Sequence, residues 1–356
     1  MFEMMIRASG KDVRIQTHDE PHIDEAAAVL LVEEYADEAF LNRFAPDGTL
    51  QLALPGCYFD EHPHNGAPRK EGECCATLVA DALQLTPRFP SLQRVLKYVL
   101  RDDTQGSGDH TTLGGTMKRL HRAFPDDTTR TMCWAIRGLR AKLREAGCCS
   151  KDFRVDAIRE VIRSLVGDEA ATHWYAEVVR ADNANQNWQQ IAEAEIADVE
   201  FEEVCLPGNV KVTIAVIETD NPRMHVVALA KGATIVIKKE GRGNVQIFSR
   251  LGSGVRFNGV ARVLGIAEQY ARHALNESGQ PQVLDDALLG VEGNPTGFWY
   301  YFPKMEAVFN GSLTERSVPA TALPLPLIRL AVIEGLKPPR LRAGLAAIRR
   351  QVQECK

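Results

Sequence analysis

Histidine and carboxylate side chains are concentrated in a short stretch near the start of the chain. Residues 17–25 read Thr-His-Asp-Glu-Pro-His-Ile-Asp-Glu, which spaces His18, His22 and Asp24 four and two positions apart. Neutral imidazole together with carboxylate suits manganese, iron, cobalt or zinc better than calcium. The spacing predicts a site for one or two divalent metal ions. The alternative is that His18 and Asp24 are helix caps or surface groups.

Two later segments carry the same kinds of side chain. Residues 60–64 read Asp-Glu-His-Pro-His, and the acidic pair Asp102 and Asp103 follows a third apolar stretch. Loops that leave the carboxyl ends of parallel strands converge on one crevice. We therefore expect the three segments to meet at a single metal centre.

The elements expected around these segments alternate between strands and helices. Residues 13–17 alternate apolar and polar side chains, which predicts a strand. Residues 25–38 are rich in alanine after several acids, which predicts a helix packed on a sheet. A short strand within residues 50–59 would bring Asp60 to the surface, and the next helix is expected at residues 72–85. Residues 92–100 predict a third helix, or a helix that runs into a strand.

The sequence as a whole predicts an α/β fold with three parts. Residues 1–115 would form a metal-binding domain with a mainly parallel sheet, residues 116–200 a helical connector, and residues 201–356 an α+β domain that closes over the site. In the last part, strands are expected at residues 210–216, 226–230, 233–237 and 245–248, and helices at residues 260–274 and 327–335.

Composition narrows the class of protein. The 356 residues are long enough for two domains, and a net charge of −5 argues against nucleic-acid binding driven by overall charge. The eight cysteines include no Cys-x-x-Cys unit, which predicts reduced thiols and a cytoplasmic protein. Since no stretch approaches the roughly 20 apolar residues that span a bilayer, no membrane partner is expected. A homodimer remains an open alternative.

The histidine-rich segments resemble motifs of the DHH phosphoesterase superfamily, named for its Asp-His-His motif. Residues 17–24 resemble its opening His-x-x-Pro-Asp-x-Asp motif, with His22 in place of the first Asp. A His at this point, followed by x-Asp-Glu, is similar to the Myg-type branch, the melanocyte-proliferating-gene exonuclease family. Residues 60–62 stand where the triplet would be, although they read Asp-Glu-His. The small-residue segment at 73–78 is similar to the start of the next helix in such proteins.

The resemblance covers roughly residues 13–113 and implies a particular metal site. It implies two divalent ions, usually manganese, with magnesium, cobalt or zinc as alternatives. His18 and His22 would bind one ion. Asp24, His62 and Asp103 would surround the other. Asp102 is the alternative to Asp103, which lies directly before Thr104 and matches the superfamily's later metal-binding Asp better.

The resemblance also implies catalytic roles and a substrate. Asp60 would bridge or support the ions, since no separate bridging Asp is evident, and His62 or His64 would position the leaving group. RNA or a short oligonucleotide is the preferred substrate. One alternative is a nucleotide or pyrophosphate hydrolase, and another is a non-catalytic metal- or nucleotide-binding regulatory protein.

Two basic pairs are candidates for substrate binding. Arg69 and Lys70 follow the second histidine segment, and the alternative for them is a solvated loop. Arg250 and Arg256 flank a loop with Gly252 and Gly254, whose backbone N–H groups could cradle a phosphate. An ordinary loop is the alternative there.

Overall fold

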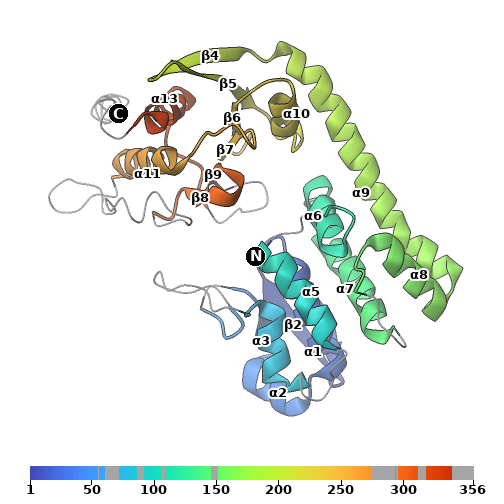
Figure 1. Ribbon diagram of the computed structural model, residues 1–356. Helices are drawn as coiled ribbons and strands as arrows, with labels where there is room; N and C mark the ends of the chain where they lie inside the picture. Colours follow the sequence, from blue (N-terminus) through green and yellow to red (C-terminus); the bar gives the residue numbers. More distant parts are fainter. Residues whose placement is uncertain are drawn as a thin grey trace. The chain divides into compact units, whose positions relative to one another are not determined.

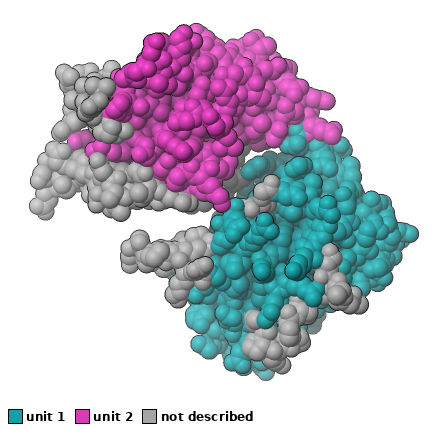
Figure 2. All heavy atoms as spheres, in the orientation of Figure 1, with its two compact units in different colours: residues 1–185 teal, residues 186–356 magenta. Residues whose placement is uncertain are grey.

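The computed structural model describes residues 1–54, 56–60, 72–85, 92–105, 109–145, 151–273, 293, 296–311 and 318–338 (Figure 1). Within these residues the chain is a mixed α/β protein with eleven α-helices and two mixed sheets, as the sequence predicts at this coarse level. The chain divides into two compact units, Met1–Asn185 and Gln186–Lys356 (Figure 2). Among the described helices, none has the length and apolar character to cross a membrane.

The sheet of unit 1 has three strands in the order β1-β2-β3. Strands β1 (Phe2–Ala8) and β2 (Lys11–Thr17) pair antiparallel through a tight turn in which Ser9 and Gly10 both have positive φ. Strand β3 (Thr49–Gln51) pairs parallel with β2. The expected strand at residues 13–17 is confirmed. The expectation of a mainly parallel sheet is not met, because β1 contributes the longer, antiparallel pairing.

Helix α1 (Ile23–Tyr35) follows the first strand pair and lies at the centre of the core of unit 1. Every residue from Ile23 to Val32 is buried, which explains why this stretch is apolar on all sides rather than on one stripe. The other helices before residue 106 are α2 (Glu38–Phe44), α3 (Cys75–Ala82) and α5 (Leu92–Gln105). The helices predicted at residues 25–38, 72–85 and 92–100 are thus present.

Helix α5 corrects the prediction for the third segment. We expected the acidic pair in a loop after an apolar stretch, but Asp102 and Asp103 lie in the last turns of this helix. No glycine or proline occurs between Leu92 and Gln105, so nothing in the sequence ends the helix earlier. The metal-ligand candidates therefore come from a helix as well as from a strand–helix loop.

The predicted helical segment is confirmed, but its packing differs from that of a connector. Its helices are α6 (Leu113–Ala123), α7 (Thr128–Arg144), α8 (Val155–Val166) and α9 (Asp168–Glu195). Buried residues from Leu113 to Ala181 belong to the same apolar cluster as Ile15 and Leu30. The division after Asn185 therefore falls inside α9, and not at the predicted boundaries of 115 and 200.

Unit 2 is built on a six-stranded sheet in the order β4-β5-β6-β7-β9-β8. Its strands are β4 (Phe201–Leu206), β5 (Val210–Glu218), β6 (Ile235–Lys239), β7 (Val245–Ser249), β8 (Tyr300–Phe302) and β9 (Ala307–Asn310). Within this sheet, as far as its strands are described, only the β5–β6 pairing is parallel. Helices α11 (Asn258–Ala271) and α13 (Leu325–Leu336) pack against each other, and their buried side chains share one apolar cluster with the sheet.

One element of unit 2 contradicts the sequence-based prediction. Residues 226–230, expected as a strand, belong to helix α10 (Met224–Ala230). Met224, Val227 and Ala228 are its buried residues, which is the spacing of one helical face. A short apolar run fits either a strand or a buried helix, and here tertiary packing selects the helix. The hairpin at residues 233–237 and 245–248 and the two later helices are confirmed.

Candidate metal centre

The junction between β2 and α1 holds the first group of candidate ligands. Strand β2 ends at the buried residue Thr17, and His22 is the N-cap residue of α1. Only five residues separate the strand from the helix, so the chain must turn sharply. This turn brings His18 close to His22: their ring centroids are 5.1 Å apart, with the rings steeply inclined at 63°.

Two overlapping groups of ligand atoms occur at this junction. His18, His22 and Glu25 form one, and His22, Asp24 and Asp103 form the other. Within each group the ligand atoms lie within 4.8 Å of one another. Four of the residues predicted as metal ligands, His22 included, therefore come together, three from the β2–α1 junction and one from the end of α5.

Glu25 is a member of this cluster that the sequence reasoning missed. Its Oε1 lies 2.8 Å from His18 Nε2, and its Oε2 accepts a hydrogen bond of 2.7 Å from the His22 backbone N–H. Burial opposes ionisation of this carboxyl, but the charge and hydrogen bond of His18 and the charge of His22 lower its pKa overall. The signal in the sequence was its position three residues after the N-cap, where capping-box carboxylates occur.

His22 has the electrostatic character of a metal ligand. Desolvation lowers its pKa from the ordinary value, and the positive charges of His18 and Lys118 act in the same direction, while Glu25 and Asp103 raise it. The net effect favours the neutral imidazole. Metal ions bind histidine in this form, so His22 does not have to lose a proton before it binds a cation.

The structure separates the roles of the two adjacent aspartates. The buried Asp102 carboxylate accepts a hydrogen bond of 3.1 Å from Lys118 Nζ and packs against Gly114, where a Cβ atom would lie only 2.6 Å from Asp102 Oδ1. Asp103 instead faces His22 and Asp24. The geometry therefore favours Asp103 as the ligand and gives Asp102 a structural role.

A buried histidine from a distant helix supports the loop beneath these ligands. His121 Nε2, from α6, forms a hydrogen bond of 3.0 Å with the Pro21 carbonyl oxygen. Burial lowers the pKa of His121 to about 4, and the nearby His22 and His18 act in the same direction, against the raising effects of the Pro21 hydrogen bond and Glu25. A neutral His121 thus holds the residue that directly precedes His22.

Other predicted site residues are not placed in the cluster. Asp60 belongs to neither ligand group in the described part of the chain, and its Oδ2 accepts a hydrogen bond of 3.0 Å from the Gly56 N–H. His62, His64, Arg69 and Lys70 lie outside the described residues. The structure therefore brings together four of the predicted metal ligands, His18, His22, Asp24 and Asp103. The catalytic roles of Asp60, His62 and His64 stay predictions.

The donor set fits a divalent cation of the manganese-to-zinc series. It offers two imidazoles and three carboxylates, the mixture of nitrogen and oxygen ligands that these ions accept. Asp24 is almost fully buried, whereas Asp103 is half-buried and His22 is exposed. An ion bound here would be held by the buried Asp24 carboxylate and would be accessible to solvent and substrate on the His22 side, as a catalytic ion must be.

The predicted phosphate loop of unit 2 lines a cavity of about 490 Å³. Arg250 and Arg256 lie in its wall together with Lys211 and Lys337. Arg256 is tied to Glu306 by an ion pair of 2.6 Å, which raises the pKa of the guanidinium. Arg250 has no acidic partner among the described residues, so its charge is available to a ligand.

Comparison with known proteins adds no relative to this picture. No protein-family model, curated protein or solved structure matches the chain. Evidence about function therefore comes from the side chains described above and from the motifs in the sequence.

Proposed function

We propose that the chain is a divalent-metal-dependent phosphoesterase that cleaves RNA or a short oligonucleotide. The observation that carries the proposal is the cluster around His22, in which ligand atoms of His18, Glu25, Asp24 and Asp103 come within 4.8 Å in two overlapping groups. A bound cation would offset the repulsion between the Asp24 and Asp103 carboxylates, which both lie beside His22.

Manganese or a related cation at this cluster would supply Lewis-acid polarisation of a phosphoryl group and activation of a water molecule. The chain's own residues prepare that chemistry. Glu25 fixes the orientation of His18, since its Oε1 is 2.8 Å from the ring nitrogen. Lys118 compensates the charge of the neighbouring Asp102 at 3.1 Å, which leaves Asp103 to face the cation.

The basic cavity of unit 2 favours a phosphate-bearing substrate. Arg250 and Arg256 stand beside Gly254 in the wall of that cavity, with the first residue of α11, Asn258, close by. Guanidinium groups and backbone N–H groups at a helix start both suit phosphate oxygens. The volume of about 490 Å³ accommodates a ligand larger than a single phosphate ion.

A cleavage assay with the full chain tests the proposal. The metal-stripped protein is supplied with manganese and an end-labelled short RNA, and in parallel with a nucleotide and with pyrophosphate. We expect manganese-dependent cleavage of the RNA, at least about a hundredfold slower in the His22→Ala variant because a metal ligand is lost. The exposed His110, which belongs to neither ligand group among the described residues, gives the matched control His110→Ala.

The outcomes separate the alternatives left open by the sequence. Turnover of nucleotide or pyrophosphate alone would assign a small-molecule hydrolase. Stoichiometric manganese binding without turnover of any of the three would assign a binding protein. Equal cleavage by His22→Ala, His110→Ala and the parent chain would overturn the assignment of the site.

A further inference from the structure

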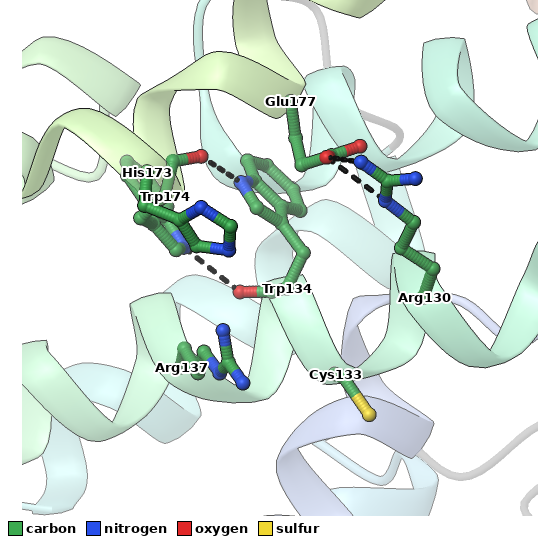
Figure 3. A pocket seen from close by; sticks show the side chains of 7 residues that line it. All are labelled: Arg130, Cys133, Trp134, Arg137, His173, Trp174 and Glu177. Atoms are coloured by element: carbon green, nitrogen blue, oxygen red, sulfur yellow. Dashed lines mark hydrogen bonds and ion pairs between the residues drawn. The ribbon is translucent and has the colours of Figure 1, made fainter. Parts of the chain in front are cut away.

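A small cavity in unit 1 lies between α7 and α9, among helices that the proposed chemistry does not use. It encloses about 220 Å³ and is lined by Arg130, Cys133, Trp134, Arg137, His173, Trp174 and Glu177. Figure 3 shows that these side chains come from two facing helices, with the two tryptophans between them. The cavity is therefore a feature of the helical segment alone.

A pair of stacked indoles makes the cavity wall rigid. The Trp134 and Trp174 rings are nearly parallel, with an interplanar angle of 10° and centroids 5.1 Å apart. Each indole N–H donates a hydrogen bond of 3.0 Å to the backbone carbonyl of the other tryptophan. Both residues are buried, so the two helices are fixed against each other at this point.

The charged groups at the rim are not balanced. Glu177 is already engaged, since its Oε1 accepts a hydrogen bond of 2.9 Å from Arg130 Nε and its Oε2 one of 3.2 Å from Arg180. Arg137 and His173 have no hydrogen bond or ion pair with any described residue. In Figure 3 these two residues lie to the left of Trp134, and the Arg130–Glu177 pair lies to its right. Two exposed donor side chains thus line a cavity whose one acidic residue, Glu177, is already paired with other arginines.

We propose that this cavity binds a phosphate group, either as the free ion or as the end of a small phosphomonoester. Arg137 and His173 approach from different helices, an arrangement that suits a tetrahedral anion with several acceptor oxygens. A planar carboxylate would pair with one guanidinium in a bidentate manner and leave His173 unused. The volume of about 220 Å³ is below the roughly 300 Å³ at which pockets for larger ligands begin, so the cavity suits a phosphate group better than a whole nucleotide.

Calorimetric titration of the full chain tests the proposal. The titrations are made in the presence of a chelator, so that no metal at the His22 cluster contributes, with inorganic phosphate, glycerol phosphate and acetate as separate probes. We expect the double variant Arg137→Ala/His173→Ala to bind phosphate at least about tenfold more weakly than the parent chain. Lys97→Ala removes an exposed charge from α5, outside this cavity, and should bind phosphate as the parent does.

The three probes distinguish the sources of the anion. Tighter binding of glycerol phosphate than of inorganic phosphate would assign a phosphomonoester, and the reverse would assign the free ion. Unchanged phosphate affinity in the double variant would overturn the proposal, and so would equal binding of acetate. Circular dichroism of both variants confirms that a lost affinity reflects the site and not the fold. None of these results depends on whether the chain cleaves RNA.

Discussion

The metal cluster of unit 1 and the basic cavity of unit 2 are built in opposite ways. The cluster gathers anionic and imidazole groups at a buried strand–helix junction, where Glu25 and Asp24 are almost fully buried. The cavity gathers exposed cations at strand ends, and the Arg256 side chain is 74% exposed. Buried ligands must be positioned precisely because their desolvation has to be offset, whereas exposed cations contribute additively and tolerate change. Substitutions should therefore have larger effects in unit 1.

The largest effect is expected when the carboxylates of the cluster lose their charge. The isosteric double variant Asp24→Asn/Asp103→Asn should lose the manganese held by the second ligand group, because that group then retains only His22. Equilibrium dialysis with metal analysis measures the stoichiometry and affinity. Asp81→Asn, an exposed position on α3, is the matched control. Normal manganese binding by the double variant would break the comparison between the two regions.

Acid sensitivity should also distinguish the cluster. His121 has a pKa of about 4 in the folded chain and 6.5 as its ordinary value, so the unfolded chain takes up the proton first as pH falls. The contribution of neutral His121 to stability is complete above pH 6.5 and is lost as pH falls towards 4. The loss amounts to roughly 3 kcal/mol.

Denaturant titrations across this pH range, with the parent chain and His121→Gln, measure that contribution. The glutamine amide can still donate to the Pro21 carbonyl but does not titrate in this range. We expect the free energy of unfolding to fall less steeply with acid in the variant. Parallel pH profiles for both proteins would show that folding does not lower the pKa of His121.

A smaller effect is expected from the residue that orients His18. Glu25→Gln preserves a hydrogen-bonding side chain but removes the charge, and we expect manganese affinity to fall by about ten- to a hundredfold. Glu33→Gln on the same helix, where Glu33 pairs with Arg140, is the control for loss of a carboxylate. If both variants bind manganese equally well, Glu25 acts only as a helix cap.

The smallest effect is expected in unit 2. Arg250→Ala should weaken binding of a short RNA, measured by fluorescence anisotropy in the presence of a chelator, by about tenfold, while manganese binding stays unchanged. Arg242→Ala, exposed in the β6–β7 turn and outside this cavity, is the control. An equal loss in both variants would indicate that overall charge, and not the cavity, attracts the RNA.

The sequence predicts the parts of the molecule that depend on neighbouring residues. The strand at residues 13–17, the helix after it and the crowding of His18, His22 and Asp24 are all local consequences of alternation, helix-starting acids and spacing. Asp103 was also expected near this site, although its position on a helix was not. These features could be predicted because only five residues separate the strand from the helix, which keeps the ligands close to one another.

Features that depend on contacts between residues far apart in the sequence could not be predicted. His121 meets Pro21 across 100 positions, and no pattern at either residue reveals the other. The short apolar run at residues 226–230 carries no periodicity long enough to separate a strand from a helix. In the edge strand β1 the exposed Met5 interrupts the alternation of apolar and polar residues, so its signal in the sequence was weak.

The Glu25 carboxylate connects the candidate metal site with the start of helix α1. Glu25 closes the first turn of α1 through the His22 amide while it grips the His18 ring. Movement of His18 towards a cation would therefore also act on the Glu25 carboxylate, which caps the first turn of α1. The rate at which the His22 amide proton exchanges with deuterated solvent should consequently depend on whether a cation is bound. A bound cation would stabilise the first turn of α1.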